Sequence, residues 1–599
     1  MRSILVVWLL WTTLAIAIGL FAGCSSGSGG DGGGSRSRRI EGGGPALMQR
    51  VFNATVQSFD GTVIAFTVFQ PALAQGIPAP LILHSHGFGG SRIRDLNNPS
   101  PLDQLTSGNV VVTALRRAWN AGYFVISFDE RGFGESGGTV QLLDPNFEGR
   151  DIQAVLDWAE ANLRPHLGFR GGDPVVGALG ASYGGGFQLI GAAVDPRFDA
   201  IVPTATWNDL RYSLNPGNVP KSLWLDILAT IGLLGSQGRL DPFLVEAFLQ
   251  AQVTGIVPQS ALDRLFNNSL QSFCAGNRPD GRGIPRVDAL LVQGVTDTLF
   301  NMNEAVRNRD CLASRDNDVR LLVQRTGHLL PLLQVAENQF GFGTDPTVRC
   351  GNHVFETAQF MLDFLDEKLL GVPPPVEIPR ICIVLDDTHG LVPNRVPVGG
   401  QRFAVAPTPL TTGPVPELVL EILRDLPLDT LLAILAPLGD NVINLVLGVI
   451  SGLQNPSALI AVLPQVLNVL PPELLNELTT AGRFVPFFVA QESRPLAGIP
   501  IARIDFTGAV EQDPIVFLGL GRQTDGGERV ELINERLAPL RGFGRYEQEL
   551  VGVSVQLQPG DTVGLLVFGF HPQYLTNFSR IPTPVAVSGE VEVPLPSAG

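Results

Sequence analysis

Short apolar segments alternate with segments of helical period through the first two thirds of the chain. Residues 52–57 and 62–69 alternate apolar and polar positions, as half-exposed strands do. Continuous apolar runs of strand length follow at residues 81–84, 124–128, 175–179, 200–203, 289–293 and 319–323. Helical patterns such as residues 149–162 and 354–370 lie between them. This alternation predicts an α/β domain over residues 48–372, with a mostly parallel sheet covered on both faces.

Residues 205–285 interrupt that alternation with helical runs, among them residues 221–234 and 242–253. They lie between the strand predicted at residues 175–179 and the strand predicted at residues 289–293. A helical cap inserted at this point would cover the carboxyl ends of the strands, where open α/β sheets gather their functional loops. We therefore expect the cap to select the substrate.

The pattern changes after three consecutive prolines at residues 373–375. Residues 381–385 and 401–406 have the pattern of strands, and several short strands separated by turns follow between residues 500 and 596, which is typical of a β-sandwich. Residues 414–478 are apolar, helical in pattern and punctuated by proline, and acidic residues break any run long enough to span a membrane. Residues 373–599 are thus predicted to form a second, jelly-roll-like domain with an apolar helical insert.

The first residues resemble a bacterial lipoprotein signal. An apolar run over residues 4–21 ends in Ala22-Gly23-Cys24, so residues 1–23 are predicted to be removed and Cys24 to be acylated. An uncleaved membrane anchor is the alternative. Residues 24–47 are rich in Gly and Ser and are predicted to form a tether. Either reading places the domains outside the cytoplasm, in the cell envelope, with a lipid membrane as one partner. A net charge of −16 argues against nucleic acid as a second partner.

One serine lies in the pattern of a catalytic nucleophile. Gly180-Ala181-Ser182-Tyr183-Gly184 follows the apolar run at residues 175–179 and precedes a helical run. G-x-S-x-G between a strand and a helix is typical of a nucleophile elbow, a tight turn that exposes the serine hydroxyl. The alternative is an ordinary glycine turn, because the chain contains 68 glycines.

A serine nucleophile needs a histidine and an acid, and both follow in the order Ser, acid, His. Asp297 follows the strand predicted at residues 289–293, and His328 follows the strand predicted at residues 319–323. Only Asp297 among the nearby aspartates lies at the carboxyl end of a strand. The others precede a strand: Asp288, Asp310, Asp316 and Asp318.

A glycine-rich loop follows the strand at residues 81–84. It could bind the negative charge that the tetrahedral intermediate of such a reaction places on the former carbonyl oxygen. His86-Gly87-Phe88-Gly89-Gly90 is similar to the HG loop of lipases and esterases, although a plain turn between a strand and a helix would have the same composition. We predict that the backbone N–H groups of Phe88 and Tyr183 form the oxyanion hole.

Four cysteines remain besides Cys24, which is an even set in an oxidising compartment, so two disulfides are predicted. Three connectivities are possible among Cys274, Cys311, Cys350 and Cys382. We expect Cys311 to pair with Cys350, because the two lie near the Asp297 and His328 loops, while Cys274 and Cys382 pair or stay free. The wide spacing argues against a metal site.

The motifs together resemble the X-prolyl dipeptidyl-peptidase and cocaine-esterase-like (CocE/NonD) hydrolases. The matching segments are residues 128–137, 180–185, 195–197, 207–210 and 293–297. The resemblance implies an α/β-hydrolase sheet with a helical cap, a carboxyl-terminal jelly roll, and Ser182, Asp297 and His328 as the catalytic triad. Cocaine-esterase relatives use a tyrosine side chain in the oxyanion loop, where this chain has Phe88.

The expected function is therefore a serine hydrolase that uses acyl-enzyme chemistry on an ester or an X-Pro-type peptide, without a cofactor or metal. The alternative is a non-catalytic protein of the cell envelope that binds lipid or polysaccharide on a hydrolase scaffold.

Overall fold

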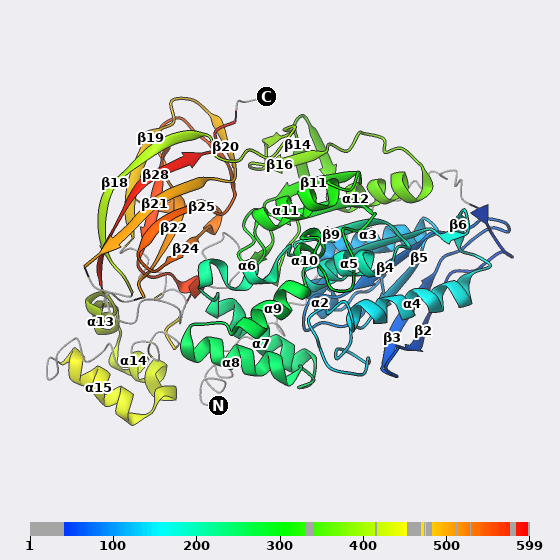
Figure 1. The fold of residues 1–599 in the computed structure, drawn as a ribbon, viewed down its shortest axis with the longest axis horizontal. Coiled ribbons are helices and arrows are strands. Elements are labelled where there is room, and N and C mark those ends of the chain that lie inside the picture. The colour runs from blue at the N-terminus through cyan, green and yellow to red at the C-terminus, as the bar shows by residue number, and fades with distance from the viewer. Residues whose placement is uncertain are drawn as a thin grey trace.

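The computed structural model describes residues 41–329, 341–413, 416–451, 466, 469–471, 474, 482–509, 513–527, 529–574 and 583–596. Figure 1 shows an α/β domain, a β-sandwich and a small group of helices beside the sandwich.

A ten-stranded sheet forms the centre of the α/β domain. Neighbours run parallel from β16 to β5, whereas the strands outside these two pair antiparallel. This confirms the predicted α/β sheet. The strand order is β17 (Gly390–Leu391), β16 (Ile381–Val384), β11 (Val319–Gln324), β10 (Asp288–Gly294), β9 (Phe198–Thr204), β8 (Val176–Ala181), β4 (Leu81–Ser85), β5 (Phe124–Phe128), β3 (Val63–Gln70) and β2 (Arg50–Gln57).

Both faces of this sheet are covered, because alternate residues of each strand enter different cores. Leu83 and Ile126 belong to the core beneath helices α4 (Glu148–Leu163), α5 (Tyr183–Val194) and α11 (Met302–Ala313). Their neighbours Ile82 and Val125 belong to the core beneath α3 (Asn109–Asn120) and α12 (Thr357–Leu365). The continuous apolar runs in the sequence follow from this two-sided burial.

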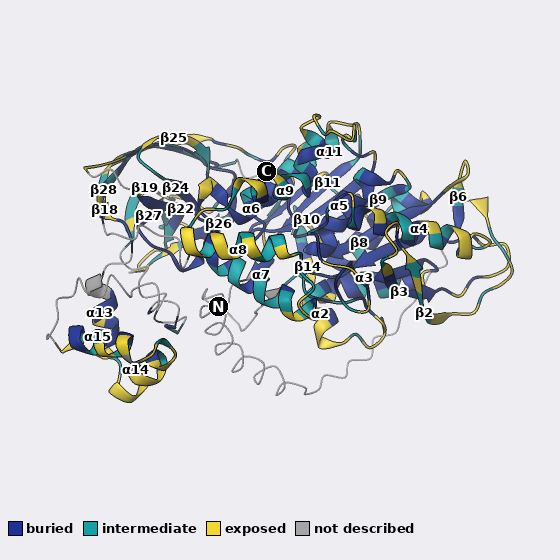
Figure 2. Ribbon diagram, turned by 60° about the horizontal axis from the view of Figure 1, so that its bottom comes forward, coloured by how far each residue is buried: buried dark blue, intermediate teal, exposed yellow. Residues whose placement is uncertain are grey.

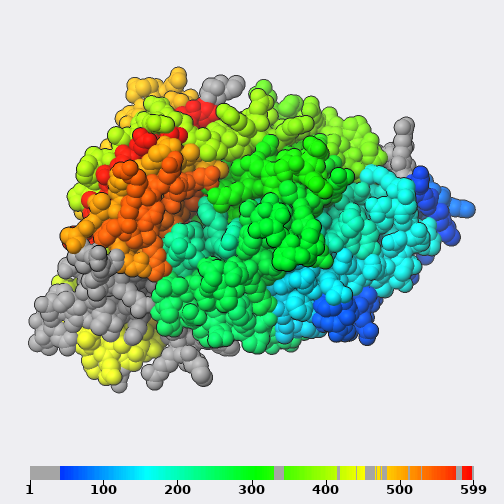
Figure 3. All heavy atoms as spheres, in the orientation of Figure 1, coloured from blue at the N-terminus to red at the C-terminus, as the bar shows by residue number. Residues whose placement is uncertain are grey.

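Five helices lie between β9 and β10, within the range predicted for the cap: α6 (Leu210–Leu214), α7 (Ser222–Gly235), α8 (Pro242–Thr254), α9 (Gln259–Asn267) and α10 (Leu270–Cys274). The sandwich follows them in the chain and lies against them in space, so that the green cap and the orange strands form a continuous surface in Figure 3.

Two antiparallel sheets face one another in the sandwich, as predicted. One has the order β18 (Gln401–Thr411), β28 (Pro584–Val593), β21 (Ile501–Gly508) and β25 (Gly544–Glu549). The other has the order β19 (Arg483–Val489), β27 (Thr562–Phe568), β22 (Ile515–Gln523) and β23 (Val530–Leu532), with β24 (Ala538–Arg541) also paired to β22. A separate pair joins β20 (Arg494–Gly498) to β26 (Val553–Leu557). Phe506 and Leu518 pack in the common core of the sandwich.

The apolar insert contributes the helices α13 (Pro416–Asp425), α14 (Leu428–Leu435) and α15 (Asp440–Ile450), which Figure 2 shows to one side of the sandwich. Most of the predicted insert beyond residue 451 lies outside the described residues. Of the helices that the structure describes, none is both long and apolar enough to cross a membrane.

Two boundaries differ from those predicted. Residues 381–384, assigned from sequence to the second domain, form β16 and extend the first sheet, where Leu322 pairs with Cys382. Part of the predicted tether is paired rather than free: β1 (Glu41–Gly42) pairs with β6 (Gly168–Arg170), and Leu47 forms an isolated bridge with Leu73. Gly42 has φ +112°, and a Cβ there would lie 2.7 Å from the Leu167 carbonyl oxygen. A residue with a side chain would not fit at this position, so the close packing requires glycine. The predicted signal and Cys24 lie outside the described residues.

The predicted Cys311–Cys350 disulfide is wrong. The structure joins Cys274 to Cys311 and Cys350 to Cys382, with Cα–Cα distances of 5.9 and 5.3 Å. The sheet explains the difference: Cys274 and Cys311 pack against the core on one face, whereas Cys350 and Cys382 belong to the core on the other. Two cysteines on opposite faces of a sheet cannot reach disulfide geometry.

Peptide mapping of the non-reduced protein should therefore recover Cys274 linked to Cys311 and Cys350 linked to Cys382. The bridges span 37 and 32 residues, so each should contribute ~3–4 kcal/mol in the chain-entropy model, and reduction should lower the melting temperature. A peptide that links Cys311 to Cys350 would contradict this assignment.

Candidate active site

Ser182 occupies a strained turn between β8 and α5. Its backbone has φ 59° and ψ −118°, a conformation that a residue with a side chain rarely adopts. The glycines around it are required sterically, because a Cβ at Gly184 would collide with the Ser85 carbonyl and one at Gly180 with the Gly184 carbonyl. The turn thus has the geometry of the nucleophile elbow that the G-x-S-x-G pattern predicts.

The three residues predicted as a triad are in contact. His328 Nε2 lies 2.8 Å from Ser182 Oγ, and His328 Nδ1 lies 2.6 Å from Asp297 Oδ2. With the Nδ1 proton on the Asp297 side, Nε2 can accept the serine proton. The other oxygen of Asp297 accepts the backbone N–H groups of Leu299 at 3.0 Å and Phe300 at 2.7 Å, so both oxygens are satisfied in a fully buried position.

Aromatic rings fix the plane of the histidine. Phe300 and Trp224 meet the imidazole of His328 edge to face, with ring centroids 5.2 and 6.0 Å away. Trp224 belongs to cap helix α7, and its Nε1 donates to Thr298 Oγ1 at 3.1 Å. The cap therefore orients the triad as well as covering it.

Lys221 supports the loop that carries Asp297, a role that was not predicted from the sequence. Its buried ammonium donates to the carbonyl oxygens of Thr298 and Leu299, both at 2.9 Å, and so holds the loop that carries Asp297. Burial, together with the nearby positive charge of Arg536, lowers the pKa of Lys221 to about 8. No local motif marks this residue, because its partners lie 77 and 78 positions away in the chain.

The loop after β4 lies beside the elbow, as predicted for an oxyanion site. His86 Nδ1 donates to the Gly87 carbonyl at 2.8 Å, and its Nε2 accepts the Glu130 N–H at 3.2 Å, so this buried ring holds the loop. No hydrogen bond among the described residues uses the N–H of Phe88 or Tyr183. The Tyr183 hydroxyl accepts the Leu143 N–H at 3.0 Å. The assignment of the two N–H groups as oxyanion donors stays a prediction.

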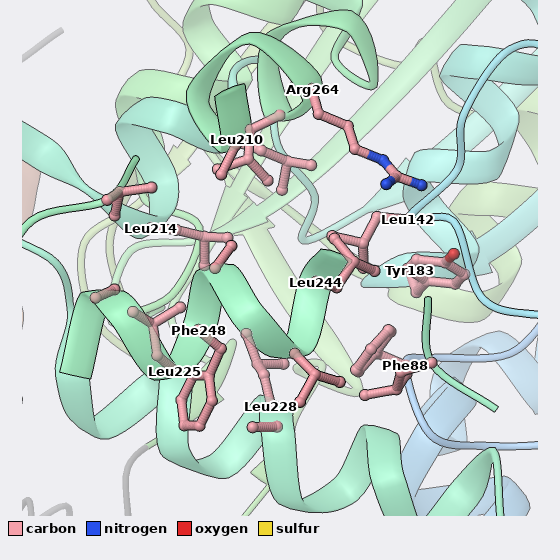
Figure 4. A pocket seen from close by; sticks show the side chains of 18 of the residues that line it. Phe88, Leu142, Tyr183, Leu210, Leu214, Leu225, Leu228, Leu244, Phe248 and Arg264 are labelled. Atoms are coloured by element: carbon pink, nitrogen blue, oxygen red, sulfur yellow. The ribbon is translucent and has the colours of Figure 1, made fainter. Parts of the chain in front are cut away.

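Ser182 lines an apolar pocket together with residues of the cap, and Figure 4 shows Leu225, Leu228 and Phe248 of the cap around this pocket. Among the described residues that line the pocket, Arg264 is the only charged one, and it donates to Asp241 at 3.0 Å. The other lining residues are Phe88, Leu142, Ser182, Tyr183, Trp207, Leu210, Leu214, Leu225, Leu228, Ala229, Leu233, Leu240, Phe243, Leu244, Val245, Ala247, Phe248, Ala251, Val257, Ala261, Leu265, Leu299 and Phe300. Within the described residues, no group of three His, Cys, Asp or Glu side chains could hold a metal ion.

Comparison with known proteins agrees with this architecture. Residues 60–330 match the family model of the X-Pro dipeptidyl-peptidases (S15 family). This part of the chain is therefore similar to the S15 family. An uncharacterised 31.7 kDa protein of Escherichia coli is 34% identical over 139 residues, which cover 22% of this chain and 39% of that protein. The chain thus spans about two fifths of the length of the curated relatives that it matches first.

Solved structures share the fold of this chain over nearly its whole length. A CocE/NonD family hydrolase from Staphylococcus aureus is 14% identical, with 92% of this chain and 94% of that one covered and a TM-score of 0.54. An aminopeptidase from a marine sediment Thaumarchaeota archaeon is 15% identical, with 96% and 99% covered and a TM-score of 0.56. An α-amino acid ester hydrolase is 14% identical, with 92% and 97% covered and a TM-score of 0.56. At these identities the likeness concerns the fold.

A fluorophosphonate probe should label Ser182, because its Oγ lies against His328 Nε2. Ser182→Ala should abolish labelling and reduce turnover to the ~10³-fold enhancement over water that binding and the oxyanion donors supply alone. Ser451→Ala is the control, since the Ser451 hydroxyl donates to helix carbonyls of Leu447 and Gly448. Labelling that persists in Ser182→Ala would refute the assignment of the nucleophile.

Proposed function

We propose that the chain is a serine ester hydrolase that forms an acyl-enzyme on Ser182. Continuous contact from Ser182 Oγ through His328 to the buried Asp297 is the single observation that carries this proposal. A non-catalytic binding protein would have no use for a strained serine held against an oriented imidazole.

Each residue has one role in the proposed reaction. Ser182 Oγ attacks the ester carbonyl while His328 Nε2 takes its proton, and Asp297 stabilises the imidazolium that results. The N–H groups of Phe88 and Tyr183 donate to the oxyanion of the tetrahedral intermediate. The alcohol leaves with the proton from His328, and a water molecule activated by the same imidazole then releases the acid and restores the Ser182 hydroxyl.

The pocket supports an ester with an apolar acyl group over an X-Pro peptide. A peptidase that recognises a free amino terminus needs an anionic partner for the ammonium group, because an unpaired buried charge is costly. No Asp or Glu lies among the described residues that line the pocket. Its aliphatic and aromatic surface instead favours a hydrocarbon chain, by ~0.8 kcal/mol for each methylene group removed from water.

Chain-length selectivity tests this proposal. On p-nitrophenyl esters, kcat/KM should rise ~2–4-fold per methylene from acetate until the pocket is full, as the transfer free energy of a methylene requires. X-Pro-p-nitroanilides should be turned over far more slowly. A kcat/KM that is highest for acetate, or an X-Pro substrate that exceeds every ester, would contradict the proposed substrate class.

Two variants of the same helix sharpen the test. Phe248 of α8 lines the pocket, whereas Val253 of α8 is 71% exposed. Phe248→Ala should lower kcat/KM for long acyl chains more than for acetate, because it removes apolar contact with the distal methylenes. Val253→Ala should leave the whole chain-length profile unchanged, and a similar response of both variants would argue against acyl binding in this pocket.

We also propose that the enzyme is a lipoprotein of the bacterial cell envelope, which the apolar run ending at Cys24 supports. Expressed in a Gram-negative host, the protein should partition into membranes, and Cys24→Ser should release it from them. Mature protein that begins with an unmodified Met1 would contradict this proposal.

A further inference from the structure

Arg536 of the sandwich places its guanidinium against the loop of the α/β domain that carries Asp297. Arg536 Nη2 donates to the Gly294 carbonyl at 3.2 Å, and Arg536 Nη1 donates to the carbonyl oxygen of Asp297 itself. The side chain is only 3% exposed. Together with Lys221 on the cap, Arg536 gives this loop buried cationic donors from two further parts of the fold.

A distorted turn of the sandwich presents Arg536. Asn534 and Glu535 before it have φ 53° and 60°, left-handed values that cost free energy in residues other than glycine. The Asn534 side chain holds the turn by two hydrogen bonds to the backbone of Ser554. It accepts the Ser554 N–H at 2.8 Å and donates to the Ser554 carbonyl at 3.2 Å. Gln573 Nε2 donates to the Glu535 carbonyl at 3.0 Å. These hydrogen bonds hold the turn, and the turn thereby fixes the position of Arg536.

The charge of Arg536 is not explained by an ion pair. Within the described part of the chain, no carboxylate lies within salt-bridge distance of its guanidinium, and a buried charge without such a partner is costly. Burial lowers the pKa of Arg536 only to about 10, so the group stays positive at neutral pH. Arg541 provides the contrast: it bridges the same domains through the carbonyls of Asn218 and Gly255, both at 2.8 Å, and pairs with Asp513.

We propose that Arg536 is a positioning residue for the ester hydrolysis: it holds the Asp297 loop so that Asp297 keeps the His328 imidazole directed at Ser182. This inference rests on the proposed function. It makes the carboxyl-terminal sandwich part of the catalytic apparatus, although none of its side chains lines the pocket among the described residues. Because no described side chain of the sandwich lines that pocket, loss of Arg536 should affect kcat rather than KM.

Kinetics of Arg536→Met on a p-nitrophenyl ester of medium chain length test the proposal. The kcat should fall ~10–100-fold, as expected for a small misplacement of a catalytic group, while KM stays within ~2-fold.

Two further variants separate positioning from general stabilisation. Arg536→Lys keeps the charge and one donor, so it should restore part of kcat. Arg541→Met removes a comparable bridge between domains and should lower the melting temperature without changing kcat. If Arg536→Met does not fold, Arg536→Gln, which retains a donor, takes its place in the same comparison.

The proposal is overturned if the folded neutral variant keeps the parent kcat, or if Arg541→Met loses kcat to the same extent. Failure of the proposed function has a different signature: the parent enzyme itself would then hydrolyse no ester and react with no fluorophosphonate.

Discussion

The hydrogen bond between the Asp297 carboxylate and His328 Nδ1 is the interaction on which the rest of the structure depends. A fully buried carboxylate is tolerated only when its oxygens are satisfied, and here the imidazole and two backbone N–H groups satisfy them. The histidine thereby acquires one tautomer and one orientation. Strain in the Ser182 backbone then becomes useful, because it directs the hydroxyl to the nitrogen that can accept its proton.

Three parts of the fold converge on the short loop that holds this carboxylate. The sheet supplies the loop at the end of β10, the cap supplies Lys221 and Trp224, and the sandwich supplies Arg536. The cap has a second task, since its aliphatic residues form the wall of the pocket above Ser182. Orientation of His328 and the proposed selection of an apolar acyl group are therefore coupled through α7, which contributes both Trp224 and the pocket residue Leu228.

The sequence predicted what local patterns determine. Strand-length apolar runs located the sheet because its strands are buried on both faces, and G-x-S-x-G identified the elbow because steric crowding at Gly180 and Gly184 admits no side chain. Position at a strand's carboxyl end was enough to select Asp297. The disulfide pairing failed because it depends on which face of the sheet each cysteine occupies. Lys221 and Arg536 were missed because their partners are backbone carbonyls far away in the chain, for which one sequence holds no signal.

The most direct measurement of the central claim is the mass of the enzyme during turnover. A reaction with p-nitrophenyl octanoate, quenched within the first turnovers and digested, should yield an octanoyl group on the peptide that contains Ser182, with p-nitrophenol released in a stoichiometric burst. Acyl transfer to a different residue, or steady release of p-nitrophenol with Ser182 unmodified and no burst under any quench time, would contradict the account.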